Sequence, residues 1–92
     1  KKNNNQLGIL VCGSGIGISI ACNRYKDIRA AVCTNTTMAK LTRIDNDANV
    51  LCLGARLIGD LLAAEITKAF LTTEFESGGR HERRVNKLNK GA

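Results

Sequence analysis

No long apolar run occurs anywhere in the sequence. Its hydrophobic stretches fall well short of the ~20 residues that a membrane-spanning helix needs, and none has the layout of a secretory signal peptide. We therefore expect a cytoplasmic protein with no membrane association. The 92 residues suffice for one small domain, which would bury about 60–65 % of the surface that its unfolded chain exposes.

Metal-ligand patterns are also missing. The cysteines form no C-x-x-C pair, and His81 is the only histidine. Because zinc needs a cluster of cysteine and histidine ligands, we expect no metal site. Most of the cysteines lie in apolar, strand-like runs, which is typical of reduced thiols in the cytosol. They are Cys12, Cys22, Cys33 and Cys52.

Aromatic residues are scarce, which disfavours nucleic acid as a partner. The net charge of +6 would suit a polyanion. However, only Tyr25, Phe70 and Phe75 are available to stack on bases, and no K/R-G-F motif is present. Much of the positive charge lies after Glu76, where a small anionic ligand explains it as well as a polymer does.

The stretch over 7–17, LGILVCGSGIG, carries the strongest local pattern. Leu7–Val11 is too short and too uniformly apolar for an amphipathic helix, which predicts a strand buried on both faces. Cys12 ends that strand, and a glycine-rich turn (Gly13–Gly17) leads into a segment with helical spacing. The backbone N–H groups of such a turn can hold a phosphate, or an oxyanion that develops during a reaction.

Two familiar glycine-rich motifs are excluded. The dinucleotide-binding fingerprint G-x-G-x-x-G fails at Ile18, and the phosphate-binding P-loop fails because no lysine lies between Lys2 and Lys26. What is unusual is the thiol at the mouth of the turn. On the pattern alone, a reactive Cys12 and a buried, inert Cys12 are equally good interpretations.

Strand-like and helix-like segments alternate along the chain. The expected strands cover 7–11, 28–33 and 50–53, and the expected helices cover about 17–24, 36–43 and 60–73. Residues 1–6 form a polar lead-in, turn-forming residues occupy 45–49, and a basic helix is expected over 80–90. This order predicts a single α/β domain over 1–92, with a parallel sheet and right-handed crossovers.

Spacing also predicts which helix faces are buried. The second helix is expected to turn Met38 and Leu41 inward, and the first places Ile16, Ile20 and Ala21 on one side. The inward residues expected of the third helix are Leu62, Ile66, Ala69 and Phe70. The turns at Cys12, 34–36 and 54–56 follow the strands, so they converge at the carboxyl edge of the sheet, where open parallel sheets bind ligands.

Four blocks of sequence together resemble the type B ribose-5-phosphate isomerases. They are GILVCGSGIG (8–17), NDANVL (46–51), LGAR (53–56) and GRHERRV (79–85). Those enzymes form one sugar-phosphate isomerase family with the galactose-6-phosphate isomerase subunits. The resemblance implies a flavodoxin-like, Rossmann-like fold with a three-layer parallel sheet. It also implies a homo-oligomer, dimer or tetramer, whose active site is shared between subunits.

The resemblance further implies a reaction. Family members interconvert ribose 5-phosphate and ribulose 5-phosphate through an enediolate, without metal or organic cofactor. Cys12 matches the base of the cysteine-type members, and Ser14 matches a hydroxyl that helps to shuttle the oxygen-bound proton. Ile18 stands where other members have a glutamate base. The backbone amides expected to hold the substrate oxygen are those of Gly13, Gly15, Ile16 and Gly17.

The resemblance assigns roles to the remaining site residues by their positions in the sequence. Asn46 matches a residue that contacts the sugar. Arg56, Arg80 and Arg84 match phosphate ligands, the last two reaching across to the partner subunit. Spacing supports the last pair independently, because Arg80 and Arg84 share one helical face with Lys87.

Three departures from the family pattern stand out. Asp45 replaces a histidine proposed to assist ring opening, and a carboxylate is a weak proton donor near neutrality. Ser77 is an extra residue before Gly78. Family members begin with two further strand–helix units that nothing here matches. We therefore expect the C-terminal part of such an enzyme, whose Cys12 strand lacks a neighbour.

We interpret the sequence as the catalytic portion of a ribose-5-phosphate isomerase that binds a small sugar phosphate. Two alternatives stay open. One is isomerisation of a six-carbon sugar phosphate, such as allose or galactose 6-phosphate. The other is a non-catalytic phosphate-binding or nucleic-acid-binding α/β domain, in which Cys12 is merely buried.

Overall fold

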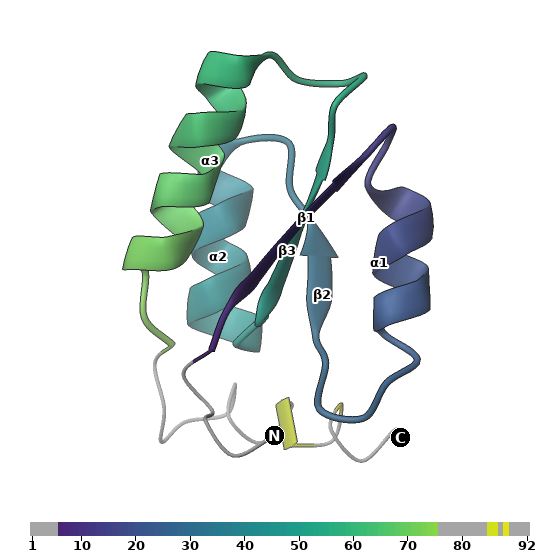
Figure 1. Ribbon diagram of the computed structural model, residues 1–92. Helices are drawn as coiled ribbons and strands as arrows, with labels where there is room; N and C mark the ends of the chain where they lie inside the picture. The colour runs from purple at the N-terminus through teal and green to yellow at the C-terminus, as the bar shows by residue number, and fades with distance from the viewer. Residues whose placement is uncertain (1–5, 76–84, 87, 89–92) are drawn as a thin grey trace.

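The computed structural model describes residues 6–75, 85, 86 and 88, and shows strands alternating with helices (Figure 1). The strands are β1 (Gly8–Cys12), β2 (Ala30–Val32) and β3 (Val50–Gly54). The helices are α1 (Ile16–Cys22), α2 (Thr36–Asn46) and α3 (Asp60–Thr72). The order and the kind of each element are as the sequence predicts.

The strands form one parallel sheet in the order β1-β3-β2. β3 pairs with β1 from Gly8↔Val50 to Cys12↔Gly54, and with β2 from Ala30↔Val50 to Val32↔Cys52. Because the strands are parallel, all of their carboxyl ends lie at one edge of the sheet. The predicted convergence of the three turns at that edge follows directly from this topology.

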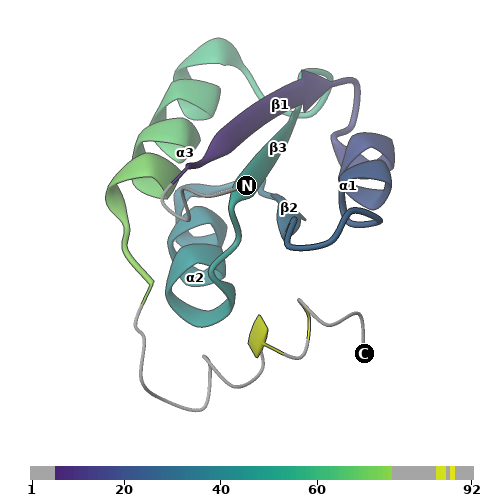
Figure 2. The same ribbon diagram turned by 60° about the horizontal axis from the view of Figure 1, so that its bottom comes forward.

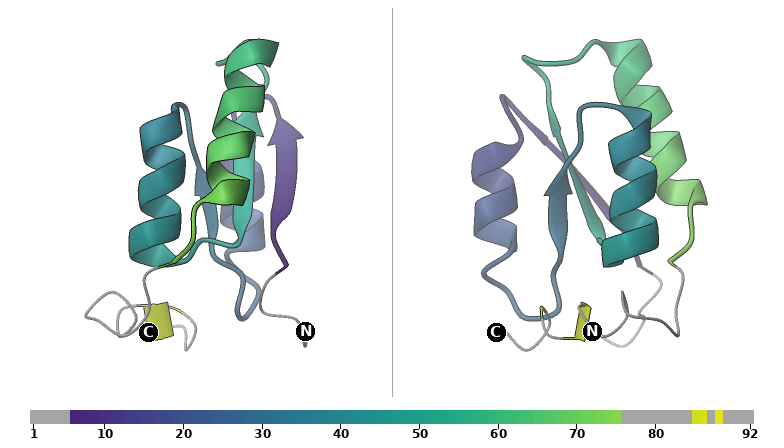
Figure 3. Two further views of the ribbon diagram at one scale, coloured as in Figure 1. Left: turned by 90° about the vertical axis from the view of Figure 1, so that its left-hand side faces the viewer. Right: turned by 180° about the vertical axis from the view of Figure 1, so that it is seen from behind.

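Helices cover both faces of the sheet. α1 lies on one side, and α2 and α3 lie on the other (Figures 1 and 3). Figure 2 shows α2 and α3 side by side, and these two helices pack against each other. The result is the three-layer α/β arrangement that the sequence predicts.

The core lies between the sheet and the layer of α2 and α3. Leu51 on the central strand, with Ile66 and Phe70 on α3, are among its largest fully buried side chains. The predicted inward face of α3 is confirmed, since Ala69 is buried and Leu62 packs against the same cluster. Apolar residues three and four positions apart give α3 one continuous buried face.

The predicted inward face of α2 is wrong. Met38 and Leu41 are 40 % and 49 % exposed, whereas Ala39 and Arg43 are buried. The small side chain of Ala39 lets the helix approach the core closely. Arg43 can be buried because its guanidinium donates hydrogen bonds to the carbonyls of Ala48 and Thr73.

The end of α2 also differs from the prediction. The helix was expected to stop near Arg43, with turn residues over 45–49, but it continues to Asn46. It ends at Asp47, which adopts the left-handed conformation with φ 49°. The predicted N-cap region is confirmed, because Asn35 Oδ1 accepts a hydrogen bond from the Met38 N–H at 2.8 Å.

The sequence predicts that Ile16, Ile20 and Ala21 lie on one side of α1, and in the structure that side faces solvent. Ile16 and Ile20 are 54 % and 58 % exposed, and Ala21 is exposed beside them. The buried residue of this helix is Ser19, whose hydroxyl donates to the Ile16 carbonyl at 2.7 Å. The apolar side of α1 is therefore an open surface in this chain.

Of the basic helix expected over 80–90, Val85, Asn86 and Leu88 are described, and all three are helical. Val85 is buried. The other residues of that segment, and the lead-in 1–5, lie outside the described residues. Among the helices that are described, none combines the length and the apolar character needed to cross a bilayer.

Candidate functional site

The candidate site begins where Cys12 ends β1 and leads into the glycine turn. Gly15 has φ +80°, a conformation strained for any other residue, and α1 starts at the next position. A Cβ on Gly15 would lie 3.2 Å from the carbonyl carbon of Leu53. Glycine thus lets the turn reverse direction while lying close against β3.

The Cys12 thiol is held inside this turn. The Gly15 N–H donates a hydrogen bond to Cys12 Sγ at 3.1 Å, and Cys12 is partly buried. The adjacent Ile16 N–H donates to Ser14 Oγ at 3.2 Å. The turn therefore points two backbone donors at the two side chains that the sequence predicts to be catalytic. Donors of this kind stabilise negative charge on their acceptors.

Arg56 joins the turn from the end of β3. Its N–H donates to the Gly13 carbonyl at 2.9 Å, and the Ala55 N–H donates to the Cys12 carbonyl at 2.7 Å. A Cβ on Gly13 would lie 3.3 Å from Arg56 Nε, so the arginine side chain crosses directly over this glycine. Arg56 is exposed, which places a positive charge beside the turn and within reach of solvent anions.

Asp45 and Asn46 lie at the opposite end of the sheet. α2 returns the chain to the amino ends of the strands, so its last residues lie far from the turn between β1 and α1 (Figure 1). Asn46 borders a hollow of about 320 Å³ together with Ile28 and Arg29, which precede β2. The structure does not bring Asn46 and Cys12 together within one chain.

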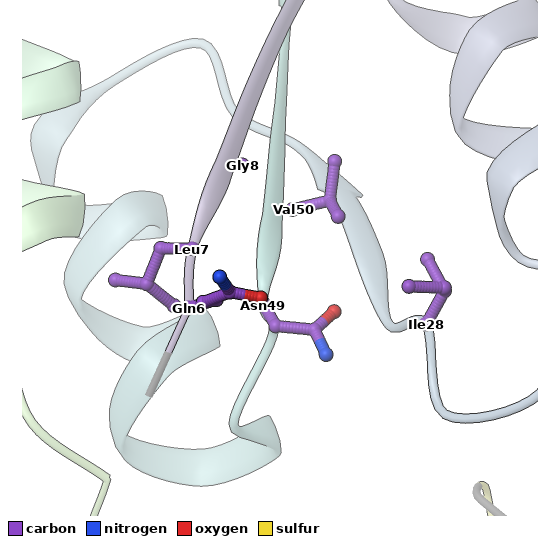
Figure 4. Close-up of a pocket in the computed structure, with 6 residues that line it drawn as sticks. All are labelled: Gln6, Leu7, Gly8, Ile28, Asn49 and Val50. Atoms are coloured by element: carbon purple, nitrogen blue, oxygen red, sulfur yellow. The ribbon is translucent and has the colours of Figure 1, made fainter. Parts of the chain in front are cut away.

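A second hollow lies at the same amino edge (Figure 4). Its volume is about 370 Å³, and it is lined by Gln6, Leu7, Gly8, Ile28, Asn49 and Val50. The Asn49 side chain is engaged there, because its Oδ1 accepts from the Arg29 N–H and its Nδ2 donates to the Asp27 carbonyl, both at 2.8 Å. This lining is mainly apolar and contains no charged side chain, so it is poorly suited to an anion.

Arg80 and Arg84 lie outside the described residues, and their role stays a prediction. The nearby Leu88 is described, and it lines the 320 Å³ hollow together with Asn46. Part of the basic segment therefore lies beside the end of α2. Among the described residues, no group of three or more His, Cys, Asp or Glu side chains is placed to hold a metal ion.

A charged cluster at the amino edge of the sheet was not expected from the sequence. The Asp47 carboxylate pairs with Arg29 at 3.3 Å and with Arg43 at 2.7 Å. A signal was present, because Arg43 precedes Asp47 by four residues, the spacing at which opposite charges meet on a helix. Its partner Arg29 is distant in sequence, and only the fold brings it into contact.

The four cysteines have different environments. Burial raises the pKa of the Cys33 and Cys52 thiols to about 11. Both are almost completely buried, at 1 % and 0 % exposure, whereas Cys12 and Cys22 are partly buried. Cys33 and Cys52 therefore stay protonated and inert at neutral pH, since the thiolate is the reactive form.

We expect iodoacetamide to label Cys12 and Cys22 in the folded protein at pH 8, and to spare Cys33 and Cys52. A pKa raised by two units leaves about 100-fold less thiolate, and burial adds a steric barrier. Peptide mapping by mass spectrometry after brief labelling measures this, with guanidinium-unfolded protein as the control that labels at all four. Rapid native labelling of Cys33 would contradict the expectation.

Fold and site together define a class of protein. It is a three-layer α/β protein in which the carboxyl edge of a parallel sheet carries a cysteine-bearing glycine turn beside an arginine. The family model described as Ribose/Galactose Isomerase matches residues 1–88. The chain belongs to this ribose/galactose isomerase family, as the resemblance predicts.

Curated relatives agree with this assignment. The chain is 54 % identical over 82 residues to a putative sugar phosphate isomerase, YwlF, of Bacillus subtilis, covering 89 % of this chain and 54 % of that protein. It is 49 % identical over 81 residues to ribose-5-phosphate isomerase B of Escherichia coli, covering 88 % and 54 %. The chain therefore spans about half the length of the curated relatives it matches.

Solved structures give the same result. A ribose 5-phosphate isomerase from Thermotoga maritima superposes with a TM-score of 0.88 at 54 % identity, covering 92 % of this chain and 58 % of that one. The type B ribose 5-phosphate isomerase of Trypanosoma cruzi has a TM-score of 0.90 at 45 % identity, covering 92 % and 57 %. The predicted Rossmann-like fold class is confirmed.

Proposed function

We propose that the chain is the catalytic part of an aldose–ketose isomerase that interconverts ribose 5-phosphate and ribulose 5-phosphate, with Cys12 as the base. The observation that carries the proposal is the 3.1 Å contact from the Gly15 N–H to Cys12 Sγ, which holds the thiol at a strand end among backbone donors. Family membership supports the reaction class, and relatives named ribose-5-phosphate isomerase B support the substrate.

The proposed reaction moves one proton between two carbons. The Cys12 thiolate takes the C2 proton of the open-chain aldose, and the C–H electrons form a C1–C2 double bond. The C1 carbonyl oxygen then carries the negative charge of an enediolate. Return of the proton to C1, with transfer of the O2 proton to O1, gives the ketose. Ser14 would relay the oxygen-bound proton. No electrons enter or leave, so the step needs no redox cofactor.

The backbone amides of the turn would stabilise the enediolate oxygen. In the structure, the N–H groups of Gly15 and Ile16 donate to Cys12 Sγ and Ser14 Oγ. Once the thiolate has accepted the substrate proton, sulfur loses its charge and becomes a weaker acceptor. The backbone N–H groups of the turn can then donate to the substrate oxygen, which has become the negatively charged acceptor. Hydrogen bonds to this oxygen would lower the activation free energy of proton abstraction.

The phosphate would bind to arginines. Arg56 extends over Gly13, so its guanidinium lies on the same side of the sheet edge as the turn. Arg80 and Arg84 share a predicted helical face and are proposed to complete the phosphate site from a second subunit. Arginine suits this task because its planar, permanently charged fork matches phosphate oxygens.

A shared site would also explain the position of Asn46. Within one chain, Asn46 lies at the amino edge of the sheet and Cys12 at the carboxyl edge. If Asn46 contacts a sugar held at Cys12, it must do so from a second copy of the chain. Asp45, at the position of the proposed ring-opening histidine, would enter the site from that same copy. We therefore propose a homo-oligomer as the active form.

A second candidate substrate is a sugar phosphate of another chain length. The family description names galactose as well as ribose. A relative from Pectobacterium atrosepticum, 51 % identical over 79 residues, is named D-erythrulose-4-phosphate isomerase. Comparing kcat/KM for ribose 5-phosphate with that for four- and six-carbon sugar phosphates would decide between them, and we expect the five-carbon substrate to give the highest value.

A non-catalytic domain that binds nucleic acid is the alternative from another class. Titrating ribose 5-phosphate and a short oligonucleotide over a salt series would separate the two, because polymer binding falls steeply with salt. We expect specific binding of the sugar phosphate. Tight, salt-sensitive binding of the oligonucleotide alone would overturn the proposed function.

We expect Arg84→Ala in the active oligomer to raise KM for ribose 5-phosphate about 10- to 100-fold, the loss that follows from one charge-assisted contact. Arg83→Ala is the matched control, because Arg83 is expected on a solvated face, and its KM should change little. Steady-state kinetics of both variants measures the difference. Equal effects of the two substitutions would show that the helical face is misassigned.

A further inference from the structure

Asp47 is at the centre of the charged cluster at the amino edge of the sheet. Its Oδ2 accepts from Arg29 Nη2 at 3.3 Å, and its Oδ1 accepts from Arg43 Nη1 at 2.7 Å. The Asp47 backbone carbonyl also accepts from Arg29 Nε at 2.7 Å. The side chains of the two arginines are only 14 % and 10 % exposed, and that of Asp47 is 29 % exposed, so these contacts are partly shielded from water. Both carboxylate oxygens and the backbone of Asp47 are therefore fixed.

The two arginines tie Asp47 to other parts of the fold. Arg43 donates to the carbonyls of Ala48 and Thr73, and its guanidinium lies 5.9 Å from the ring centroid of Phe70. This joins the end of α2 to the end of α3. Arg29 precedes β2 and joins the cluster to the sheet. The position of Asp47 is thus set jointly by a helix pair and a strand.

Asp47 also decides where α2 ends. Its left-handed backbone, φ 49°, stops the helix, and Asn46 is the last helical residue. Asn46 is exposed, although it borders the 320 Å³ hollow. Whatever fixes Asp47 therefore fixes the last turn of α2, which carries Asn46.

We propose that Asp47 is a positioning residue, which with Arg29 and Arg43 holds Asn46 in the geometry needed to contact a sugar bound at the Cys12 turn of a second copy. The inference rests on the proposed function, because it takes its ligand from there. Asp47 itself touches no substrate. Its contribution is to prevent the end of α2 from unwinding or rotating when the two chains form a site between them.

Asp47→Asn tests this directly in the active oligomer. Asparagine keeps the size of the side chain and tolerates the left-handed backbone, but it loses the charge that pairs with two arginines. We expect Asn46→Ala to lower kcat/KM about tenfold, the upper range for a neutral hydrogen bond, and Asp47→Asn to lower it to a similar extent. The double variant should be no slower than Asn46→Ala alone, since both changes remove one interaction.

Asp27→Asn is the matched control. Asp27 is also an aspartate with positive φ, at 66°, and its carboxylate makes no ion pair among the described residues. It should leave kcat/KM unchanged.

Thermal unfolding of every variant identifies an assay temperature at which each is folded. If Asp47→Asn does not fold, Arg29→Lys replaces it, because lysine keeps the charge but loses the forked contacts, and the same non-additivity with Asn46→Ala is expected.

Additive losses in the double variant would overturn the inference, because they would mean that Asp47 acts on stability and not through Asn46. Unchanged kinetics in Asn46→Ala would overturn it as well, because Asn46 would then make no functional contact for Asp47 to position. Neither result bears on the base, because loss of solvent exchange in Cys12→Ser tests the isomerase reaction separately.

Discussion

Replacing Cys12 with serine is expected to lower turnover of ribose 5-phosphate at least about 100-fold, the lower end of general-base effects. A serine hydroxyl has nearly the size of the thiol, but it barely ionises near neutrality. Binding of the sugar phosphate should be nearly intact, because the arginines and the turn amides remain. A large fall in kcat with little change in substrate affinity would therefore indicate that Cys12 acts in the chemical step.

Solvent exchange makes this test independent of product formation. With the parent protein in deuterated water, we expect the C2 proton of the substrate to exchange, and with Cys12→Ser we expect that exchange to disappear together with turnover. Cys33→Ser is the control, because Cys33 lies after β2 and is 1 % exposed. Exchange at the parental rate in Cys12→Ser would rule out Cys12 as the base.

Gly54→Ala is expected to cause the largest loss of stability. A Cβ at this position would lie 2.6 Å from the carbonyl carbon and oxygen of Ser14 and 2.8 Å from its Cα. These are backbone atoms, so no side-chain rotation relieves the clash and the whole turn must shift. Overpacking of this kind costs about 3 kcal/mol in the free energy of unfolding. For a chain of this size, that lowers Tm by roughly 12–24 °C.

Gly59→Ala provides the comparison for that result. A Cβ on Gly59 would meet no atom within 4 Å, and its backbone is extended with φ −83°. Because Gly59 is the N-cap of α3, where alanine is less favourable than glycine, its free energy of unfolding should fall by no more than about 1 kcal/mol, well below the loss at Gly54. Thermal and urea unfolding of both variants measure the difference. Equal midpoints would mean that the turn does not rest on β3 as described.

The strongest sequence patterns predicted the fold well. Leu7–Val11 predicted a strand that the structure places at Gly8–Cys12, one residue later, but its predicted burial on both faces is wrong, because Val11 is 60 % exposed and no residue of β1 is fully buried. The inward face of α3 was also correct, because Ile66 and Phe70 belong to a long, regular apolar pattern that only one packing satisfies. Alternation of strands and helices was then enough to predict a parallel sheet, since parallel neighbours need a crossover between them.

The buried arginine could not be predicted from local sequence. Spacing rules assign charged residues to the solvent side, so Met38 and Leu41 were expected to face the core in place of Arg43. Arg43 is buried because Thr73 and Phe70, which lie far along the chain, provide a carbonyl and a ring for its guanidinium. Tertiary partners of this kind leave no trace within the helix itself.

The candidate site was predicted in part. The turn, its thiol and its neighbour Arg56 are close in the structure, as expected for residues that follow adjacent parallel strands. Asn46 was assigned from a resemblance, which states that a residue contacts substrate but not from which copy of the chain. Only the path of α2 back to the amino edge reveals that separation.

The place of β1 at the border of the sheet has a consequence for how the chain behaves in solution. Within the described residues, β1 pairs on one side only, and its sequence GILVC contains no charge, proline or bulge. Val11 is 60 % exposed, and Ile9 and Val11 border an apolar hollow beside α3. The free N–H and C=O groups of such a strand form a template that another extended segment can join. Unless a further strand caps it, the edge that carries Cys12 is also where the chain is most prone to aggregate.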